Sequence, residues 1–218
     1  SFWVDGPAGR HVLRIAPRDD AGFLFYEKRM MRQEPSLHRL LVERTDLPVA
    51  PIVAHDFSRN FVDSDWVLMT ALPGAPMSDL PLSQTQRDRA LCQTGEALAQ
   101  LHRLAAPDCL GGELFGYVGE HAPMQPQPTW ADAFHVMWHL LLDDVIACGA
   151  YSGPEADGMR RLLDRHAGCF DRPVPATLLH MDVWAQNLLV DGSGNLTGLV
   201  DFDRALWGDV EIEFAVLD

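Results

Sequence analysis

The sequence has few positively charged residues for its length. Of its 218 residues, 17 are Lys or Arg and 31 are Asp or Glu, so the formal net charge at pH 7 is −14. A chain of this charge repels the phosphate backbone of nucleic acids and attracts cationic partners. A nucleic-acid partner is therefore not expected, although acidity of this kind also serves solubility alone.

Closely spaced cysteines, an export signal and a membrane-spanning segment are missing as well. The four cysteines form no CxxC pair, so reduced thiols are expected at Cys92, Cys109, Cys148 and Cys169. No basic segment followed by an apolar run and a cleavage site opens the sequence. The longest apolar stretch, residues 134–150, contains His and Asp and is shorter than the roughly 20 residues that span a bilayer. We expect a cytoplasmic protein without a membrane partner.

Residues 1–72 consist mainly of short β-type runs. The stretch "SFWVDGPAGRHVLRIAP" predicts a hairpin closed by "DGPAG", and "APIVAHDF" and "DWVLMTAL" predict two further strands. Residues 23–43 have helical spacing that Pro35 interrupts, which predicts one broken helix or two short ones. We expect a small mixed β-sheet with one helical segment.

Residues 73–84 are dense in proline and glycine, which predicts a connection between two lobes and a boundary after residue 72. The second lobe, residues 73–218, contains three amphipathic segments, at 83–104, 129–149 and 154–170, and Ser83 is a suitable N-cap for the first. The residues of this first helix expected to face the core are Ala90, Leu91, Ala97, Leu98 and Leu101. From residue 176 the chain returns to short β-type runs.

A polar hairpin is predicted near the end of the sequence, with "GSGN" as its turn. If Asp191 pairs with Leu196, the register puts Asn187 opposite Val200 and beside Asp201, with opposed Cβ atoms roughly 5 Å apart. Amide and carboxylate oxygens are ligands that Mg²⁺ accepts. Two oxygen-bearing side chains would thus meet within reach of one divalent cation.

The loop "HMDVWAQN", residues 180–187, enters this hairpin and contains Asp182. A base that accepts a hydroxyl proton in phosphoryl transfer would lie here, beside the metal. A polar turn between two buried strands is the simpler interpretation. An iron site of two His and one carboxylate is excluded, because no histidine follows His180.

Several segments resemble one known family. "LLHMDVWAQNLLVD" and "GLVDFDRALWGDVEIEFA" resemble the catalytic and metal-binding segments of the aminoglycoside phosphotransferase and choline kinase-like family, small-molecule relatives of the protein kinases. "HVLRI" resembles the strand that contacts the ATP phosphates, "QEPSLHRLLVERTDLPVAP" the helix and strand after it, and "WVLMTALPGAPM" the interlobe hinge. With "LAQLHRL" these segments cover most of residues 10–217.

The resemblance implies an α+β, two-lobed, protein-kinase-like fold. The small β-sheet lobe would be truncated, because the family's glycine-rich loop should precede "SFWVDG". In the second lobe, the family usually has further helices after "EFAVLD". The mainly helical second lobe would carry a catalytic loop at 180–187 and a metal hairpin at 187–203. An incomplete or weakened kinase is one expectation from these differences.

Carried over residue by residue, the resemblance implies that Asp182 is the catalytic base and that Asn187 and Asp201 bind magnesium. His180 would orient the loop, and Asp209 would brace it from beneath. Asp203 follows Asp201 by two positions, so both side chains would share one side of an extended segment. A second metal, the substrate and solvent all remain open as its partner.

The resemblance also assigns the nucleotide site. Arg14 takes the place of a basic residue, commonly Lys, that contacts the phosphates; Glu34 is its expected partner and Glu27 the competing one. An arginine keeps the charge but has a larger, forked head group. Three hinge residues would offer backbone groups to adenine, and two strand residues would form the floor beneath it: Met69, Thr70 and Ala71, then Leu189 and Val200.

The implied function is transfer of the γ-phosphate of ATP, or of GTP, to a hydroxyl of a small cationic molecule, with Mg²⁺. An aminoglycoside-like antibiotic, choline, homoserine and a sugar are all compatible acceptors, and the oligomeric state is open. Four acidic residues are candidates to face the acceptor, namely Asp143, Asp144, Glu211 and Glu213. The alternative is a non-catalytic nucleotide-binding protein with the kinase fold.

Overall fold

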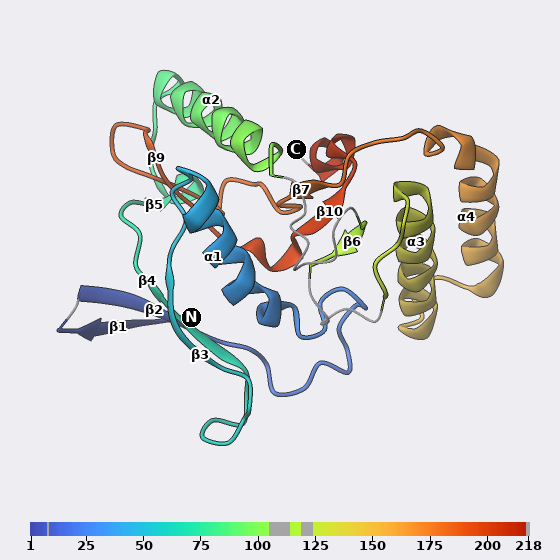
Figure 1. Ribbon diagram of the computed structural model, residues 1–218, viewed down its shortest axis with the longest axis horizontal. Coiled ribbons are helices and arrows are strands. Elements are labelled where there is room, and N and C mark those ends of the chain that lie inside the picture. The colour runs from blue at the N-terminus through green and yellow to red at the C-terminus, as the bar shows by residue number, and fades with distance from the viewer. Residues whose placement is uncertain (8, 105–113, 119–123, 217–218) are drawn as a thin grey trace.

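A computed structural model describes residues 1–7, 9–104, 114–118 and 124–216 of the protein. Cys109 lies outside these residues, and Cys92, Cys148 and Cys169 are free thiols. A four-stranded sheet forms one end of the molecule and a pair of helices the other (Figure 1). No helix in the described ranges is long and apolar enough to cross a membrane.

The sheet at the first end has the strand order β1-β2-β4-β3. Its strands are β1 Phe2–Gly6, β2 Gly9–Ile15, β3 Ile52–Asp56 and β4 Trp66–Thr70. The expected strands and the hairpin around "DGPAG" are present, but every neighbouring pair is antiparallel, so the sheet is not mixed. The reason is the connection from β2 to β3, which returns the chain to the far edge and leaves β4 to fill the place between them.

The predicted broken helix is one short turn followed by a regular helix. Residues 21–29 form turns, η1 covers Met30–Gln33 and α1 covers Glu34–Arg44. Pro35 lies in the first turn of α1, where the missing N–H removes no helical hydrogen bond. Pro35 therefore begins the helix and does not break it.

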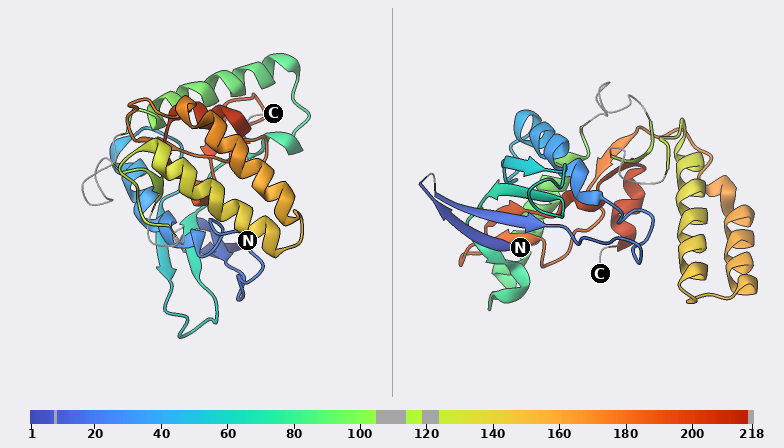
Figure 2. Two further views of the ribbon diagram at one scale, coloured as in Figure 1. Left: turned by 90° about the vertical axis from the view of Figure 1, so that its right-hand side faces the viewer. Right: turned by 90° about the horizontal axis from the view of Figure 1, so that it is seen from below.

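The second part of the chain contains the three predicted helices and two small sheets. The helices are α2 Gln84–Leu101, α3 Trp130–Ala147 and α4 Gly153–His166. The sheets have the orders β6-β10-β7 and β5-β8-β9, with β5 Ala75–Pro76, β6 Gly116–Tyr117, β7 Thr177–Leu179, β8 Leu188–Val190, β9 Leu196–Leu199 and β10 Leu206–Gly208. Short 3₁₀ turns complete it: η2 Met77–Asp79, η4 Ala167–Cys169, η5 Phe202–Arg204 and η6 Val210–Val216. Helices α3 and α4 run side by side away from the rest (Figure 2).

Helix α2 begins as predicted. Ser83 is its N-cap, and Ser83 and Gln86 form a reciprocal capping box that satisfies two N–H groups of the first turn. Of the expected core residues, Leu91 is wrong, because 52% of it is exposed. The others are buried, since they lie on the face of α2 that meets the main core.

The main hydrophobic core joins both ends of the chain. Leu37 and Leu41 of α1 are fully buried in the same cluster as Leu98 of α2 and Leu178 of β7. A second, smaller cluster under the large sheet contains Met31, Ala50, Val67 and Met69. Helix α1 thus holds the sheet against the second part of the chain. The boundary after residue 72 stays a prediction.

The β8–β9 hairpin has the predicted register at its open end. Leu189 pairs with Gly198, and Val200 N–H donates to the Asn187 carbonyl over 3.1 Å, so Asn187 lies opposite Val200. At the turn the register shifts, and Leu196 pairs with Val190 instead of with Asp191. The Asp191 carboxylate instead accepts N–H groups of the turn. The shift lies between Leu189 and Val190, so the pairing at the open, polar end of the hairpin keeps the predicted register.

We predict that Gly74→Ala destabilises the fold. Gly74 has a φ of +94°, and a Cβ there would lie 2.7 Å from the Val190 carbonyl oxygen and also collide with Thr197 Oγ1. The free energy of unfolding should fall by about 2 kcal/mol or more. In the matched control, Gly95→Ala, the new Cβ meets open space within α2, and stability should rise by roughly 0.5–1 kcal/mol. Urea unfolding measures both; equal effects would contradict the role of Gly74.

Candidate active site

A cavity of about 410 Å³ lies between the large sheet and the β8–β9 hairpin. This volume is in the range of small-molecule and cofactor sites. Its lining includes seven of the residues singled out from the sequence: Arg14, Met69, Thr70, Asn187, Leu189, Val200 and Asp201. A larger cavity of about 570 Å³, beside the start of α3, contains none of them. The smaller cavity is therefore the candidate site.

The hinge differs in detail from the expectation. Thr70 N–H donates to the Pro51 carbonyl over 3.0 Å and Ala71 N–H to the Arg10 carbonyl over 3.1 Å, so the fold already uses both donors. Ala71 is not among the residues that line the cavity, whereas Leu72 is. The Leu72 N–H has no hydrogen-bond partner within the described part of the chain. Leu72, one position after the three residues expected at the hinge, therefore has a backbone donor available at the cavity.

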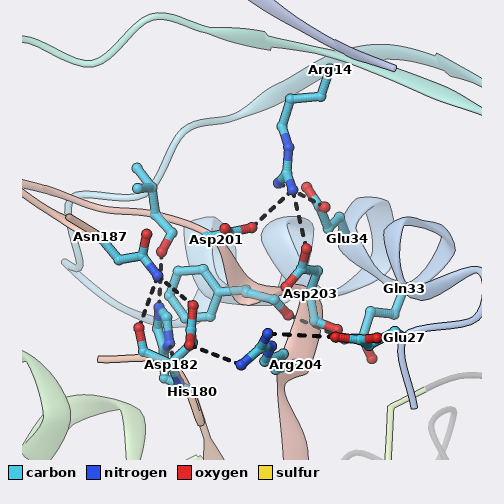
Figure 3. Close-up of polar contacts among 12 residues, drawn as sticks. Arg14, Glu27, Gln33, Glu34, His180, Asp182, Asn187, Asp201, Asp203 and Arg204 are labelled. Carbon is cyan, nitrogen blue, oxygen red and sulfur yellow. Dashed lines mark hydrogen bonds and ion pairs between the residues drawn. The ribbon is translucent and has the colours of Figure 1, made fainter. Parts of the chain in front are cut away.

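Arg14 of β2 joins three carboxylates (Figure 3). Its Nη1 donates to Glu34 Oε1 over 2.8 Å, and its Nη2 donates to Asp201 Oδ1 over 2.8 Å and to Asp203 Oδ2 over 3.2 Å. Glu34 is thus the partner of Arg14, as predicted, and the competing Glu27 is not. One guanidinium group ties β2, the start of α1 and the segment after β9.

Burial and charge act strongly within this cluster. Glu34 is fully buried, and burial raises the pKa of its carboxyl to about 8 although Arg14 opposes the rise. Burial, followed by the charge of Asp201, raises the pKa of Asp203 to about 7. Burial lowers the pKa of Arg14, but the three acids outweigh it and hold the pKa above its ordinary value. One arginine does not neutralise three acids.

The cluster fits a hard divalent cation. One oxygen each from Glu34, Asp201 and Asp203 lie within 4.8 Å of one another. Glu34 Oε2 is buried and has no hydrogen-bond partner among the residues that the structure describes. Oxygen-only donors of this kind suit Mg²⁺. Asp203, whose partner the sequence left open, belongs to this cluster.

The backbone brings Asp201 and Asp203 together in a way that the sequence did not predict. Asp201 has a left-handed conformation, with φ 70° and ψ 61°, and the chain then enters the 3₁₀ turn η5. The segment is therefore not extended, and alternation along a strand is not the reason that both carboxylates share one side. They meet because both bind the Arg14 guanidinium.

Asp182 is held on both of its carboxylate oxygens. Asn187 Nδ2 donates to Asp182 Oδ2 over 2.7 Å and to the Asp182 carbonyl over 2.9 Å. This orientation turns the amide oxygen of Asn187 away from Asp182 (Figure 3). Arg204 Nη1 lies 3.2 Å from Asp182 Oδ1. Arg204 was missed in the sequence, although a basic residue directly after "DFD" was the available signal.

His180 holds the loop from inside the core. It is fully buried, its Nε2 lies 3.0 Å from the Val200 carbonyl, and its Nδ1 accepts the Asp182 N–H over 3.2 Å. Since Nδ1 accepts, the ring proton is on Nε2. Burial lowers the pKa of His180, so the ring is neutral and orients the loop.

Glu213, not Asp209, braces the catalytic loop. The Glu213 carboxylate accepts the N–H groups of His180 and Met181, each over 2.8 Å. Burial raises the pKa of Glu213, but His102 and the two N–H groups outweigh it and hold the pKa below its usual value. Asp209 instead pairs with Arg172, because Asp209 lies at the end of β10, whereas Glu213 is carried back to the loop by η6. The buried Glu213 cannot face an acceptor.

Two further contacts connect η1 and α1 to η5, behind the loop. Phe202 is fully buried, and its ring centre lies 4.4 Å from that of His180 and 5.7 Å from that of His38. Gln33 Nε2 donates to the carbonyls of Phe202 and Asp203. No pattern in the sequence marks Gln33, because its partners lie in a distant segment.

The two acidic candidates on α3, Asp143 and Asp144, have partners within the fold. Asp144 accepts the Phe25 N–H, and Asp143 pairs with Arg160 between α3 and α4. Asp143 therefore serves the helix pair.

Comparison with known proteins agrees with this geometry. The model of the phosphotransferase enzyme family matches residues 1–217. A thermostable mutant of aminoglycoside phosphotransferase APH(4)-Ia, in ternary complex with AMP-PNP and hygromycin B, has a TM-score of 0.64 and 19% identity, over 98% of this chain and 65% of that one. No curated protein matches the sequence closely enough to be compared.

Two other solved structures are similar. A putative aminoglycoside phosphotransferase from Ralstonia eutropha JMP134 has a TM-score of 0.61 and 16% identity, over 93% of this chain and 55% of that one. Macrolide 2'-phosphotransferase MphH from Brachybacterium faecium has a TM-score of 0.58 and 16% identity, over 99% and 67%. At such identities the likeness establishes the two-lobed kinase-like fold. The chain spans 65–66% of the length of the APH(4)-Ia structures.

We predict that Glu34→Gln gains stability relative to the wild type as the pH rises from 5 to 8. A carboxyl group whose pKa rises on folding, here from 4.5 to about 8, contributes stability at low pH and loses it as the pH approaches the folded-state value. Gln cannot ionise, so the variant avoids this loss, which should be about 3 kcal/mol.

Urea unfolding in metal-free buffer at several pH values measures the difference between the two proteins. The difference is needed because burial lowers the pKa values of His38 and His180, which act in the opposite direction in both proteins. Glu155→Gln is the matched control. Ser152 lowers the pKa of Glu155, so the contribution of Glu155 to stability changes with pH only below the range from 5 to 8. A difference that stays constant with pH would contradict the assignment.

Proposed function

The chain belongs to the phosphotransferase enzyme family, and on this premise we propose that it transfers the γ-phosphate of ATP, or of GTP, to a hydroxyl of a small cationic molecule. The proposal includes Mg²⁺, a cytoplasmic location and the division into lobes 1–72 and 73–218. The observation that carries it is that Arg14, Asn187 and Asp201 line one cavity and that Asn187 holds the Asp182 carboxylate by a hydrogen bond.

The cavity supports a nucleotide site. Thr70 and Leu72 would offer backbone groups to the base, and Leu189 and Val200 would form an apolar floor for it. Arg14 faces the same cavity, and its fork of donors matches phosphate oxygens. The solved APH(4)-Ia complex with AMP-PNP gives independent support for a nucleotide in this fold.

Asn187, Asp201 and Asp203 would hold Mg²⁺ on the phosphates. Bound there, the ion neutralises the charge of the triphosphate during transfer. Arg14, which now binds Asp201 and Asp203, is within reach of both the metal ligands and the cavity. Glu34 would then keep Arg14 oriented from the protein side.

Asp182 would receive the proton of the acceptor hydroxyl. As the acceptor oxygen forms its bond to the γ-phosphorus, the bond from that phosphorus to the bridging oxygen of ADP breaks, and the hydroxyl proton passes to Asp182. Asn187 fixes one carboxylate oxygen by a hydrogen bond of 2.7 Å, which leaves the other on the side of Arg204. Positioning of this kind supplies much of the catalysis in phosphoryl transfer.

The acceptor is proposed to be cationic because the protein has a formal net charge of −14 and attracts positive ligands. The similar APH(4)-Ia structure contains hygromycin B, which favours an aminoglycoside-like molecule. Choline, homoserine and sugars belong in the same assay panel.

We predict that Asp182→Asn abolishes transfer and retains nucleotide binding. Asn keeps the size and the Asn187 contact but cannot take the proton, so kcat should fall about 10²- to 10⁴-fold. Labelled ATP, Mg²⁺ and the acceptor panel measure transfer, and the rise in unfolding temperature with ATP and Mg²⁺ measures binding. Asp164→Asn, a change at a side chain that is 65% exposed, is the control. Nucleotide binding without transfer by the wild type would favour the non-catalytic alternative.

We further predict that Asp201→Asn weakens the response to Mg²⁺. The wild-type unfolding temperature should rise with Mg²⁺ and ATP as RT ln(1 + [L]/Kd) requires, and the variant should need about tenfold more Mg²⁺ for the same rise. Isothermal titration with MgCl₂ in the presence of AMP-PNP gives the affinity directly. The control is again Asp164→Asn, and an unchanged affinity in Asp201→Asn would rule out its role as a ligand.

A further inference from the structure

Arg204 lies where three cation-binding groups converge. Its Nη1 is 3.2 Å from Asp182 Oδ1, and its Nη2 is 3.7 Å from Glu27 Oε1 (Figure 3). Its guanidinium carbon lies 5.8 Å from the centre of the Tyr26 ring. Two carboxylates and an aromatic face are the groups that bind an organic cation in proteins. The position is therefore a cation site that the chain fills with its own side chain.

The walls of this site are held by contacts other than Arg204. Glu27 Oε2 accepts the Leu24 N–H over 3.1 Å. The Tyr26 ring stacks on Tyr117, with 5.7 Å between centres and 7° between planes. Asp182 is fixed by Asn187. Because each wall has its own support, the site keeps its shape when the guanidinium moves out.

Arg204 itself is the least constrained member. Its side chain is 38% exposed, compared with 20% for Arg14, and its two ion pairs are at 3.2 and 3.7 Å. Partly exposed pairs at such distances contribute little, because water screens them and a long side chain loses freedom in forming them. An incoming cation can replace Arg204 at small cost.

A ligand at this position would be placed for reaction. One of the two carboxylates is Asp182, the proposed base, so a hydroxyl next to the bound cation would lie beside it. Glu27 and Asp203 also line an adjoining cavity of about 200 Å³, which offers room for the body of a ligand. The chemistry selects a primary amine or guanidine with a neighbouring hydroxyl.

We propose that the Arg204 guanidinium occupies the cation position of the acceptor site in the free protein, that a cationic acceptor displaces it, and that Glu27 and Tyr26 select this acceptor. The inference rests on the proposed function and identifies residues that select the substrate. Arg204 competes with the acceptor and is not a catalytic residue. If Arg204 were purely structural, its removal would instead weaken ligand binding.

Isothermal titration with hygromycin B, without nucleotide, tests the displacement. Arg204→Gln removes the competing cation and should lower the Kd about two- to fivefold, whereas Glu27→Gln should raise it by a similar factor. Arg160→Gln is the matched control, because Arg160 also bridges two carboxylates but far from the loop, and it reports the general effect of losing one charge. Arg204→Lys keeps the positive charge and should have a Kd close to that of the wild type.

The inference is overturned if the Kd of Arg204→Gln equals or exceeds that of Arg160→Gln. It is also overturned if no variant binds hygromycin B at millimolar concentration. Glu27→Gln gives an independent result should Arg204→Gln fail to fold. In steady-state assays Arg204→Gln should lower KM for the cationic acceptor, and Glu27→Gln should raise it. If titration gives the expected order but no phosphate is transferred, the proposed function fails and the cation site stands.

Discussion

The Arg14 guanidinium is the interaction on which the site depends. It lies between Glu34, Asp201 and Asp203, and so connects the sheet, the start of α1 and the end of the β8–β9 hairpin. Without it, the buried carboxylates of Glu34 and Asp203 would face each other and the partly exposed Asp201, and removal of one partner from a buried ion pair costs about 3–5 kcal/mol. A cation in the cluster relieves the repulsion among the three carboxylates, which explains why these acids suit both an arginine and a metal ion.

The catalytic loop is held from the side opposite this cluster. Glu213 binds the N–H groups of His180 and Met181, and the His180 ring reaches the Val200 carbonyl just after β9. Phe202 lies against both His180 and His38. The loop that carries Asp182 is therefore fixed by the core, whereas the groups in front of Asp182 are partly exposed. A fixed carboxylate beside a partly exposed surface supports the proposed role of Asp182.

Parts of the site followed from local sequence patterns. The turn at "GSGN" and the apolar arms beside it predicted that Asn187 would lie opposite Val200, and a hydrogen bond of 3.1 Å joins them. The partnership of Arg14 with Glu34 came from resemblance to a family. Local reasoning failed at Leu91 and for the direction of the strands, and the resemblance failed at Asp209, because each outcome depends on how distant elements pack.

The sequence by itself determined the strands, the three long helices, the hairpin register and the family, since periodicity, turn residues and short motifs are properties of neighbouring positions. Only the tertiary structure decided that Glu213 supports the loop, that Asp203 joins the metal cluster and that Arg204 stands in front of Asp182. Burial and charge pairing act between segments far apart in the chain. Their outcome depends on three-dimensional distances, which no local pattern records.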